Sequence, residues 1–413
     1  MPSATLTFVF AIERGAPAPL TRQRTKAGVP FAGKYRVIDF TLANCLHSGL
    51  RQVLVLTQYK SHSLQKHLRD AWSLFNAELG EFITAVPPQM RTGGDWYGGV
   101  LDALRQNRYL IERSRAEQVL LLDGGLVYRM DYAELIRAHR EQAGGVTCAV
   151  RPAGAAAAHG VVALHCDDGD RLQGLTHRPA LDADTAFDAP MGVYVVDKAL
   201  LLRELDALAA AEAEAASAAD PASPPGAGAD LATHLLPPLL ERETVHAYRF
   251  GGERGRVTPD RYWSDLGSTD AYFRANMALL EAEPPLDLYQ PDWNILTYQG
   301  QYPPARTVPG ATSGNEGIFV NSMLAAGSVI RGGGVSHSVL FPLVEVEDGA
   351  IVDETILFEG VKVGEGAQIR RCICDKDVIV RPGARIGFDR AADEARFDVS
   401  ADGIVVVPKG EQV

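Results

Sequence analysis

The spacing of cysteine and histidine residues indicates whether this chain has a metal site or a redox site. None of the five cysteines forms the C-x-x-C pair of a zinc or redox site, and an odd number predicts reduced thiols rather than disulfides: Cys45, Cys148, Cys166, Cys372 and Cys374. Cys372 and Cys374 lie two apart in a predicted strand, so both point to one face and are interpreted as packing residues. The ten histidines lack ligand spacing such as H-x-x-x-H, so we expect no structural zinc site.

The segments that would position other functional residues are short apolar runs that alternate with amphipathic stretches. The runs at 5–12, 52–57 and 118–123 are rich in aliphatic residues, as buried parallel strands are. The stretches at 62–74 and 100–115 between them predict helices. This alternation predicts a doubly wound α/β sheet, in which ligands bind at the carboxyl ends of the strands.

The pattern changes near residue 315 to a short repeat. Aliphatic residues recur every six positions at Ile351, Leu357, Val363 and Ile369, and Gly-Ala pairs recur at 349–350, 366–367 and 383–384. Such a period predicts a parallel β-helix, whose stacked coils each bury one aliphatic side chain per side. An ordinary β-sandwich is the alternative.

Charge and hydropathy exclude some classes of function. The formal net charge of −12 argues against a general nucleic-acid or anionic-membrane binder, although it permits a local basic pocket for phosphates. The apolar run at 5–12 is too short to cross a membrane and has no basic residues before it, so we expect a cytoplasmic protein without a signal peptide. Residues 206–229 are of low complexity and predict an alanine-rich helix extension followed by a flexible surface loop.

One long segment resembles a known enzyme family. Residues 22–72, RQRTKAGVPFAGKYRVIDFTLANCLHSGLRQVLVLTQYKSHSLQKHLRDAW, closely resemble the ADP-glucose pyrophosphorylases, the bacterial glucose-1-phosphate adenylyltransferases of glycogen synthesis. The likeness continues in WYGGVLDAL (96–104), YWSDLG (262–267), DLYQPDWNILTYQGQYPPA (287–305) and RFDVSADGIVVVPKG (396–410). It implies a Rossmann-like nucleotidyltransferase domain over residues 1–285, followed by a linker and a left-handed parallel β-helix over residues 286–413.

The resemblance also implies a reaction, a cofactor and partners. The family makes ADP-glucose and diphosphate from ATP and glucose 1-phosphate with Mg²⁺, and its members are tetramers that respond to sugar-phosphate effectors. By position, Lys26 and Asp265 correspond to catalytic residues, and Asp265 also to a metal ligand. The positions that correspond to substrate-binding residues are Gln58, Tyr97, Gly99, Gly160 and Arg178. Those that correspond to regulatory residues are Lys34, Arg36 and Trp96.

Each of these residues also has a structural interpretation. Tyr97 is of a type that often packs in a core, and Lys34 could be a solvated surface residue. Asp265 precedes a predicted helix that begins near Ser268, where acidic residues are common for structural reasons.

The phosphate-binding loop is the first place where the chain departs from the family. The family carries GGRGSRLxxLT after its first strand, whereas residues 11–21 read AIERGAPAPLT. Pro17 and Pro19 have no N–H group to donate to a phosphate. Ile12 cannot easily adopt the positive φ open to glycine, and Glu13 adds a negative charge beside a triphosphate.

The metal and sugar-phosphate positions also differ. Gly125 stands where the family's metal-binding aspartate belongs, and Asp123, two residues earlier, is a candidate displaced metal ligand. His177-Arg178-Pro179 replaces the family's Glu-Lys-Pro, which leaves Arg178 to bind the sugar phosphate with a geometry unlike that of lysine.

These departures leave two main hypotheses. The first is a catalytically impaired family member that acts as a regulatory or structural subunit, in a homotetramer or in a heterotetramer with an active paralogue, because the phosphate, metal and sugar sites are all altered. The alternative is an active glucose-1-phosphate adenylyltransferase, in which Asp123 and Asp265 hold Mg²⁺ and Arg178 holds the sugar phosphate. A sensor of sugar phosphates or nucleotides without a partner enzyme is a third possibility.

Overall fold

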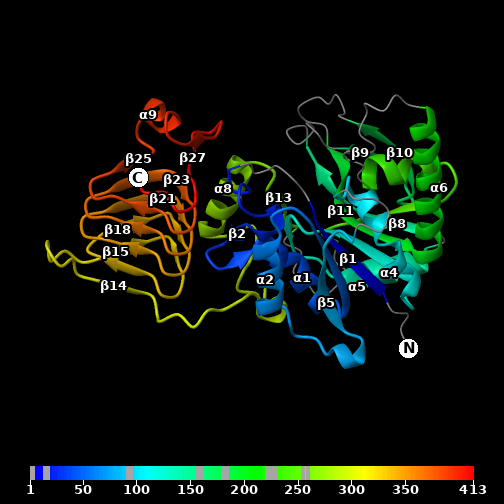
Figure 1. Ribbon diagram of the computed structural model, residues 1–413, viewed down its shortest axis with the longest axis horizontal. Coiled ribbons are helices and arrows are strands. Elements are labelled where there is room, and N and C mark those ends of the chain that lie inside the picture. The colour runs from blue at the N-terminus through cyan, green and yellow to red at the C-terminus, as the bar shows by residue number, and fades with distance from the viewer. Residues whose placement is uncertain are drawn as a thin grey trace.

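Two domains make up the chain, an α/β domain and a β-helix, which lie side by side in Figure 1. The computed structural model describes residues 5–12, 19–89, 96–142, 144–154, 162–177, 186–218, 231–252, 256 and 261–413. In these ranges, none of the helices combines the length and the hydropathy that crossing a membrane requires. The division expected at residues 285/286 falls between α8 (Thr269–Met277) and β14 (Arg306–Val308), and its exact place stays a prediction.

A nine-stranded mixed sheet forms the centre of the α/β domain. The order is β10-β9-β11-β6-β1-β4-β5, and β8 pairs with both β11 and β12. Neighbours among β5, β4, β1 and β6 are parallel, whereas β11 runs antiparallel to β6 and β8. The strands are β1 (Thr5–Ala11), β4 (Gln52–Thr57), β5 (Phe82–Val86), β6 (Gln118–Asp123), β8 (Val146–Ala153), β9 (Val162–Cys166), β10 (Leu172–His177), β11 (Phe187–Asp197) and β12 (Val245–Arg249).

Helices cover both faces of this sheet, as the alternating sequence predicted. Val9 of β1 belongs to the core shared with α1 (Val37–His47), α2 (His62–Ala71) and α5 (Tyr132–Glu141). Its neighbour Phe8 belongs to the opposite core, because successive strand residues face opposite ways. That second core is covered by α3 (Val100–Gln106), α4 (Arg108–Arg113), α6 (Lys198–Ala218) and α7 (Leu236–Leu240).

The predicted elements match this layout closely. The three apolar runs coincide with β1, β4 and β6, and the stretch at 100–115 divides into α3 and α4 at Asn107. The alanine-rich segment extends α6 to Ala218, as expected. The remainder of the predicted flexible loop, 219–229, lies outside the described residues.

The second domain is a parallel β-helix. Val346, Val363 and Val380 are paired neighbours on successive coils, so the repeat between these coils is 17 residues. Its strands are β14, β15 (Ile318–Val320), β16 (Met323–Leu324), β17 (Val329–Arg331), β18 (Gly334–Ser336), β19 (Val339–Leu340), β20 (Glu345–Val346), β21 (Ile351–Leu357), β22 (Lys362–Val363), β23 (Gln368–Cys374), β24 (Ile379–Val380), β25 (Arg385–Ile386), β26 (Asp398–Val399) and β27 (Val405–Val407). The small helix α9 (Arg390–Glu394) lies between β25 and β26.

The strict six-residue period expected for the core was wrong at one position. Ile351 opens β21 and is 49% exposed, whereas its neighbour Val352 is buried and pairs with Ile369 of the next coil. The reason is the length of the coil, because 17 residues are one fewer than three turns of six. The missing residue shifts the inward positions by one along the chain.

A shared core and a buried ion pair join the two domains. Tyr272 on α8 packs edge-to-face on Phe358 of the β-helix, with ring centroids 6.4 Å apart. Beside them the Arg24 guanidinium donates two hydrogen bonds to the Asp375 carboxylate, at 3.0 and 2.8 Å, and both side chains are 6% exposed. The β-helix is therefore packed firmly against the α/β domain.

The cysteines are free thiols, as their spacing predicted. Cys372 and Cys374 are buried inside the β-helix with their sulfur atoms 3.6 Å apart, so they are core residues. No group of three or more His, Cys, Asp or Glu side chains suited to a metal ion occurs in the described part of the chain.

Candidate active site and inter-domain pocket

A cavity of about 370 Å³ opens at the carboxyl ends of β1 and β6. This is the edge at which parallel α/β sheets bind ligands. Its lining includes the charged residues Asp123, Arg151 and Asp265, and also Trp263 and Gly192.

Strand pairing brings Asp265 to this edge from a distant part of the chain. The short strand β13 (Trp263–Asp265) runs antiparallel to β7 (Leu126–Tyr128), and Asp265 pairs with Leu126 directly after the β6–β7 turn. The following helix α8 begins only at Thr269, with Ser268 as its capping residue. Asp265 is therefore a strand residue at a cavity rather than an acid in the first turn of a helix.

Lys26 and Asp265, the two residues that the sequence marked as catalytic, are in contact. The Lys26 ammonium lies 2.5 Å from Oδ1 of Asp265, although 239 positions separate them in the sequence. The Lys26 side chain is 6% exposed, whereas that of Asp265 is 49% exposed toward the cavity. The pair thus presents a carboxylate to a ligand while a buried cation holds it in place.

The turn after β6 has no carboxylate at Gly125. The Gly125 N–H donates to Oδ1 of Asp123 at 2.7 Å, which fixes the orientation of that carboxylate. A Cβ atom at Gly125 would lie 3.1 Å from Cδ of Lys26 and 3.2 Å from Asp123 Oδ1, so any side chain here must displace Lys26 slightly. Lys26 therefore packs over the position at which the sequence resemblance predicts the family's aspartate.

Asp123 and Asp265 suit a small divalent cation only in part. Mg²⁺ is commonly held by one or two carboxylates together with substrate phosphates and water, so a pair of aspartates lining one cavity fits this donor set. The ammonium of Lys26 already lies on one oxygen of Asp265. The residues present fit a metal ion that a bound phosphate helps to hold.

Arg151 is a charged residue of the cavity that the sequence analysis missed. Its guanidinium carbon lies 3.8 Å from the centroid of the Trp263 ring, and it lines the same cavity as Asp265. Burial lowers the pKa of Arg151, while the negative charge of Asp265 acts in the opposite direction. The available signal was its place in the run 146–153, where Val150 is apolar and the next residue must face the other side of the sheet.

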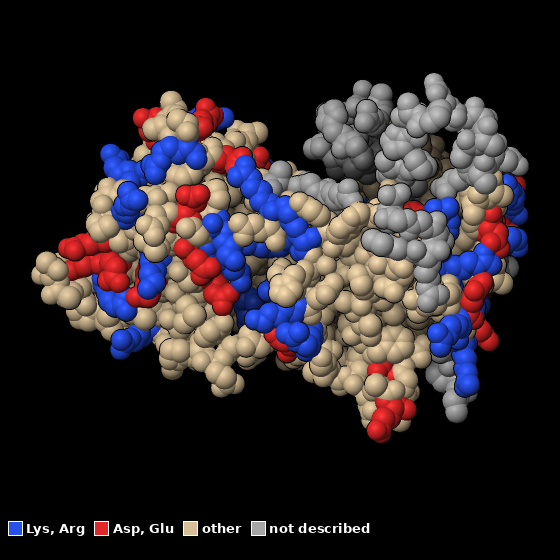
Figure 2. Space-filling model, in the orientation of Figure 1, with Lys and Arg blue, Asp and Glu red and all other residues tan. Residues whose placement is uncertain are grey.

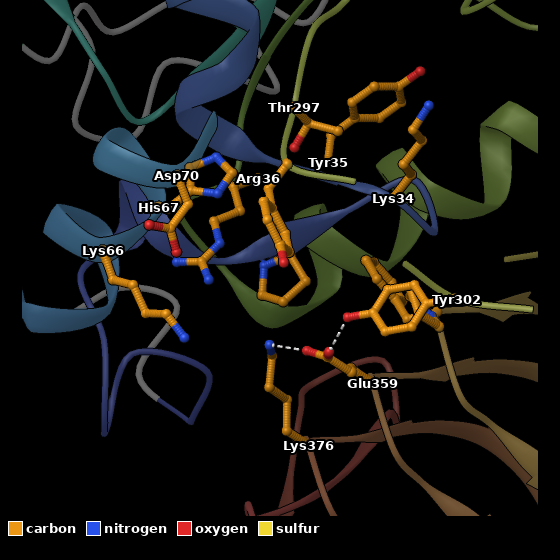
Figure 3. Close-up of a pocket in the computed structure, with 14 residues that line it drawn as sticks. Lys34, Tyr35, Arg36, Lys66, His67, Asp70, Thr297, Tyr302, Glu359 and Lys376 are labelled. Carbon is orange, nitrogen blue, oxygen red and sulfur yellow. Dashed lines mark hydrogen bonds and ion pairs between the residues drawn. The ribbon is translucent and has the colours of Figure 1, made fainter. Parts of the chain in front are cut away.

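A second cavity, of about 280 Å³, lies between the two domains, and its lining is rich in positive charge. It includes four cations, Lys34, Arg36, Lys66 and Lys376, and Figure 3 shows Arg36 and Lys376 reaching it from opposite domains. Lysine and arginine side chains also gather over the junction of the domains in Figure 2. Two of the predicted regulatory residues, Lys34 and Arg36, therefore share one site.

A carboxylate and a backbone carbonyl already contact two of these cations. The Lys376 ammonium lies 2.5 Å from Glu359, which also accepts a hydrogen bond from the Tyr302 hydroxyl at 2.8 Å (Figure 3). Burial lowers the pKa of Lys376, although the neighbouring Glu359 charge opposes this shift. The Arg36 guanidinium donates to the Ser63 carbonyl at 2.9 Å. An anionic ligand would meet cations that are positioned in advance.

Comparison with known proteins shows the family to which this chain belongs. Residues 18–282 match the Nucleotidyl transferase family model and residues 303–407 match the GlmU-like, C-terminal hexapeptide model. The "Glucose-1-phosphate adenylyltransferase 2" of Vibrio parahaemolyticus is 48% identical over 401 residues, which cover 96% of each chain. The "Glucose-1-phosphate adenylyltransferase" of Rhodopirellula baltica is 37% identical over 99% of this chain and 91% of its own. The chain belongs to the glucose-1-phosphate adenylyltransferase family.

Membership confirms the resemblance and the fold expected from it. The hexapeptide match and the stacked parallel strands together identify the second domain as a left-handed parallel β-helix. The glucose-1-phosphate adenylyltransferase of Methylococcus capsulatus, 36% identical over 98% of this chain, extends the same relationship to another relative.

Several positions assigned from the family have structural partners here. The Gln58 amide donates to the Ile12 carbonyl at 2.7 Å and so holds the end of β1. The Tyr97 side chain is buried, its hydroxyl accepts from Asn107 at 2.8 Å, and burial raises its pKa to about 12. Gly99 is the residue before α3. A role in substrate binding stays a prediction for all three.

The remaining predicted site residues either do not line the inter-domain pocket or lie outside the described residues. Trp96 is 48% exposed and packs edge-to-face against Tyr59, and neither residue lines the inter-domain pocket. Gly160, Arg178 and most of the phosphate-loop segment, 13–18, lie outside the described residues. The cation expected to hold the sugar phosphate thus has no described position.

Proposed function

We propose that the chain catalyses adenylyl transfer from ATP to glucose 1-phosphate, forming ADP-glucose and diphosphate. The observation that carries this proposal is the Lys26–Asp265 pair, whose aspartate lines the cavity together with Asp123. Names of relatives that are up to 48% identical over nearly the whole chain support it.

The chemistry requires positioning and charge neutralisation rather than a covalent intermediate. A phosphate oxygen of glucose 1-phosphate bonds to the α-phosphorus of ATP, while the bond from that phosphorus to the bridging oxygen breaks and diphosphate leaves. Asp123 and Asp265 would hold Mg²⁺, which supplies charge neutralisation for the phosphates. Lys26 keeps the Asp265 carboxylate oriented and adds positive charge at the cavity.

The test is an assay of purified protein with ATP, Mg²⁺ and glucose 1-phosphate, following release of diphosphate. Replacement of Asp265 by Asn or of Lys26 by Met should lower kcat by about 10²–10³. The matched control is Asp206→Asn, an exposed aspartate on α6 that pairs with Arg108. Turnover that survives in Asp265→Asn would remove the basis of the proposal.

A second candidate function is a regulatory subunit that works with an active paralogue. The observation that favours it is Gly125, over which Lys26 packs in place of a carboxylate. In that case the purified chain alone would be inert, and co-expression would change the turnover or the effector response of the paralogue. No change in either property would exclude this role.

Regulation and assembly complete the proposal. The cations around Lys34 and Arg36 suit a sugar-phosphate effector, because phosphates bind where several cations converge. A tetramer, homomeric or with a paralogue, and a place in the cytoplasm are proposed on the same family relationship. Titration with a hexose bisphosphate tests the effector site, and light scattering tests the tetramer.

A further inference from the structure

Arg151 carries hydrogen-bonding capacity that the described residues do not use. On β8, Val150 is 1% exposed in the apolar core, and the next residue, Arg151, lies on the opposite face of the strand and lines the cavity with Asp265. Its Nη1 donates to the Pro152 carbonyl at 3.3 Å. Its Nε is buried and has no hydrogen-bond partner among the described residues, which is a costly state for a guanidinium.

The guanidinium is held in position by an aromatic ring. It stacks on Trp263 with 3.8 Å between the guanidinium carbon and the ring centroid, and the Trp263 indole N–H donates to the Met191 carbonyl at 3.3 Å. That carbonyl lies where the pairing of β11 with β8 shifts between Pro190 and Tyr194. Stacking on a fixed indole orients the planar fork of an arginine before a ligand binds.

Strand order indicates which end of the cavity Arg151 serves. Arg151 pairs with Ala189, so it lies beside the Pro190-Met191-Gly192 segment of β11, which lines the same cavity. The expected triphosphate loop follows β1, and β8 is separated from β1 by β11 and β6. A ligand that meets Arg151 is therefore placed at the sugar-phosphate end of the cavity.

We infer that Arg151 binds the phosphate of the sugar phosphate in this cavity. A phosphate monoester carries two negative charges and accepts paired hydrogen bonds from a guanidinium fork. The identity of the ligand as glucose 1-phosphate rests on the proposed function. The assignment gives the site a phosphate-binding cation in the described part of the chain, on a strand that the family's Glu-Lys-Pro segment does not include.

Titration calorimetry with the full-length protein tests this assignment without depending on turnover. Glucose 1-phosphate is titrated into the wild type, Arg151→Met, Arg151→Lys and the control Arg137→Met, whose arginine is exposed on α5. The Arg151→Met variant should bind about tenfold more weakly or worse, because a charged hydrogen-bonding partner is lost. Arg151→Lys should lose less, and the control should bind as the wild type does.

A titration with ATP distinguishes the two phosphate-bearing substrates. Affinity for ATP should be unchanged in Arg151→Met, and thermal unfolding of each variant identifies any loss of folding. Equal affinity of the wild type and Arg151→Met for glucose 1-phosphate would overturn the assignment, as would a loss confined to ATP or a wild type that does not bind the sugar phosphate. Arg151-dependent binding without turnover would keep the assignment and refute the proposed function instead.

Discussion

The cavity at Asp265 and the inter-domain pocket at Lys34 each take a lysine from one short stretch of chain, Lys26 and Lys34, yet they differ in character. The pocket gathers four cations from both domains around a single space. At the cavity Asp265 is already paired with Lys26, and Gly125 stands where the sequence resemblance predicts an aspartate. The pocket thus has the converging cations that anion binding requires. The cavity has fewer of the groups that catalysis requires.

A buried ion pair is close in sequence to residues of both regions. Arg24, two residues before Lys26, binds Asp375 of the β-helix, and the next residue, Lys376, lines the inter-domain pocket. The ion pair is therefore close in sequence to Lys26 in the α/β domain and to Lys376 in the β-helix. The comparison teaches that packing between the domains positions the pocket, whereas strand pairing within the α/β domain positions Asp265 at the cavity.

The largest expected effect comes from breaking this ion pair. Asp375→Ala leaves the Arg24 guanidinium buried without its carboxylate, which should destabilise the protein by about 3–5 kcal/mol. Chemical denaturation followed by fluorescence measures the loss. The double variant Arg24→Met/Asp375→Leu should lose much less, since no charge remains buried. Equal losses for the single and double variants would contradict a role for the pair itself.

Restoring a carboxylate in the cavity should have the next largest effect. Gly125→Asp adds a third acidic side chain beside Asp123 and should raise turnover about tenfold or more if the missing carboxylate limits the reaction. Gly125→Ala is the matched control, because it introduces the same Cβ contact with Lys26 without the charge. Initial-rate assays compare the two, and equal rates would place the limiting defect elsewhere, as in the phosphate loop.

The inter-domain pocket should respond to loss of one cation. Lys376→Met should weaken binding of a hexose bisphosphate by about tenfold, because one charge-assisted contact is removed. Calorimetry with the purified protein measures this, and Lys362→Met, an exposed lysine of β22 paired with Glu345, is the control. Unchanged affinity in Lys376→Met would show that the ligand does not reach the β-helix side.

The smallest effect concerns pH and Glu359. Burial raises the pKa of this carboxyl group, but the nearby Lys376 charge and hydrogen bonds prevail, so its pKa lies below the usual 4.5. Its ionised form therefore stabilises the fold at pH values above 4.5, by less than about 1 kcal/mol for a partly exposed pair. This contribution is lost as the pH falls below 4.5.

Thermal unfolding of wild type and Glu359→Gln checks this expectation. The difference in Tm between the two proteins should be present at pH 7 and shrink as the pH falls below 4.5. A difference that stays constant over this range would show that the ionisation of Glu359 does not contribute.

Much of the architecture could be predicted because it depends on local periodicity. Buried parallel strands are apolar throughout, so β1, β4 and β6 were recognisable, and a repeated coil imposes a repeated sequence. The exception is Ile351, which is exposed because the coil is 17 residues long and a period of six does not divide it. The site was predictable only where family motifs marked it, as at Lys26 and Asp265.

The sequence by itself determined the family, the two-domain layout and the position of the altered motifs. Only the tertiary structure decided which charges meet. Pairing of β13 with β7 brings Asp265 to Lys26, and packing of the β-helix brings Asp375 to Arg24, across 239 and 351 positions of the chain. The side-chain alternation of β8 likewise turns Arg151 toward Trp263. Periodicity reports which face a residue takes, whereas the partner on that face is fixed only when distant strands pair and the domains pack together.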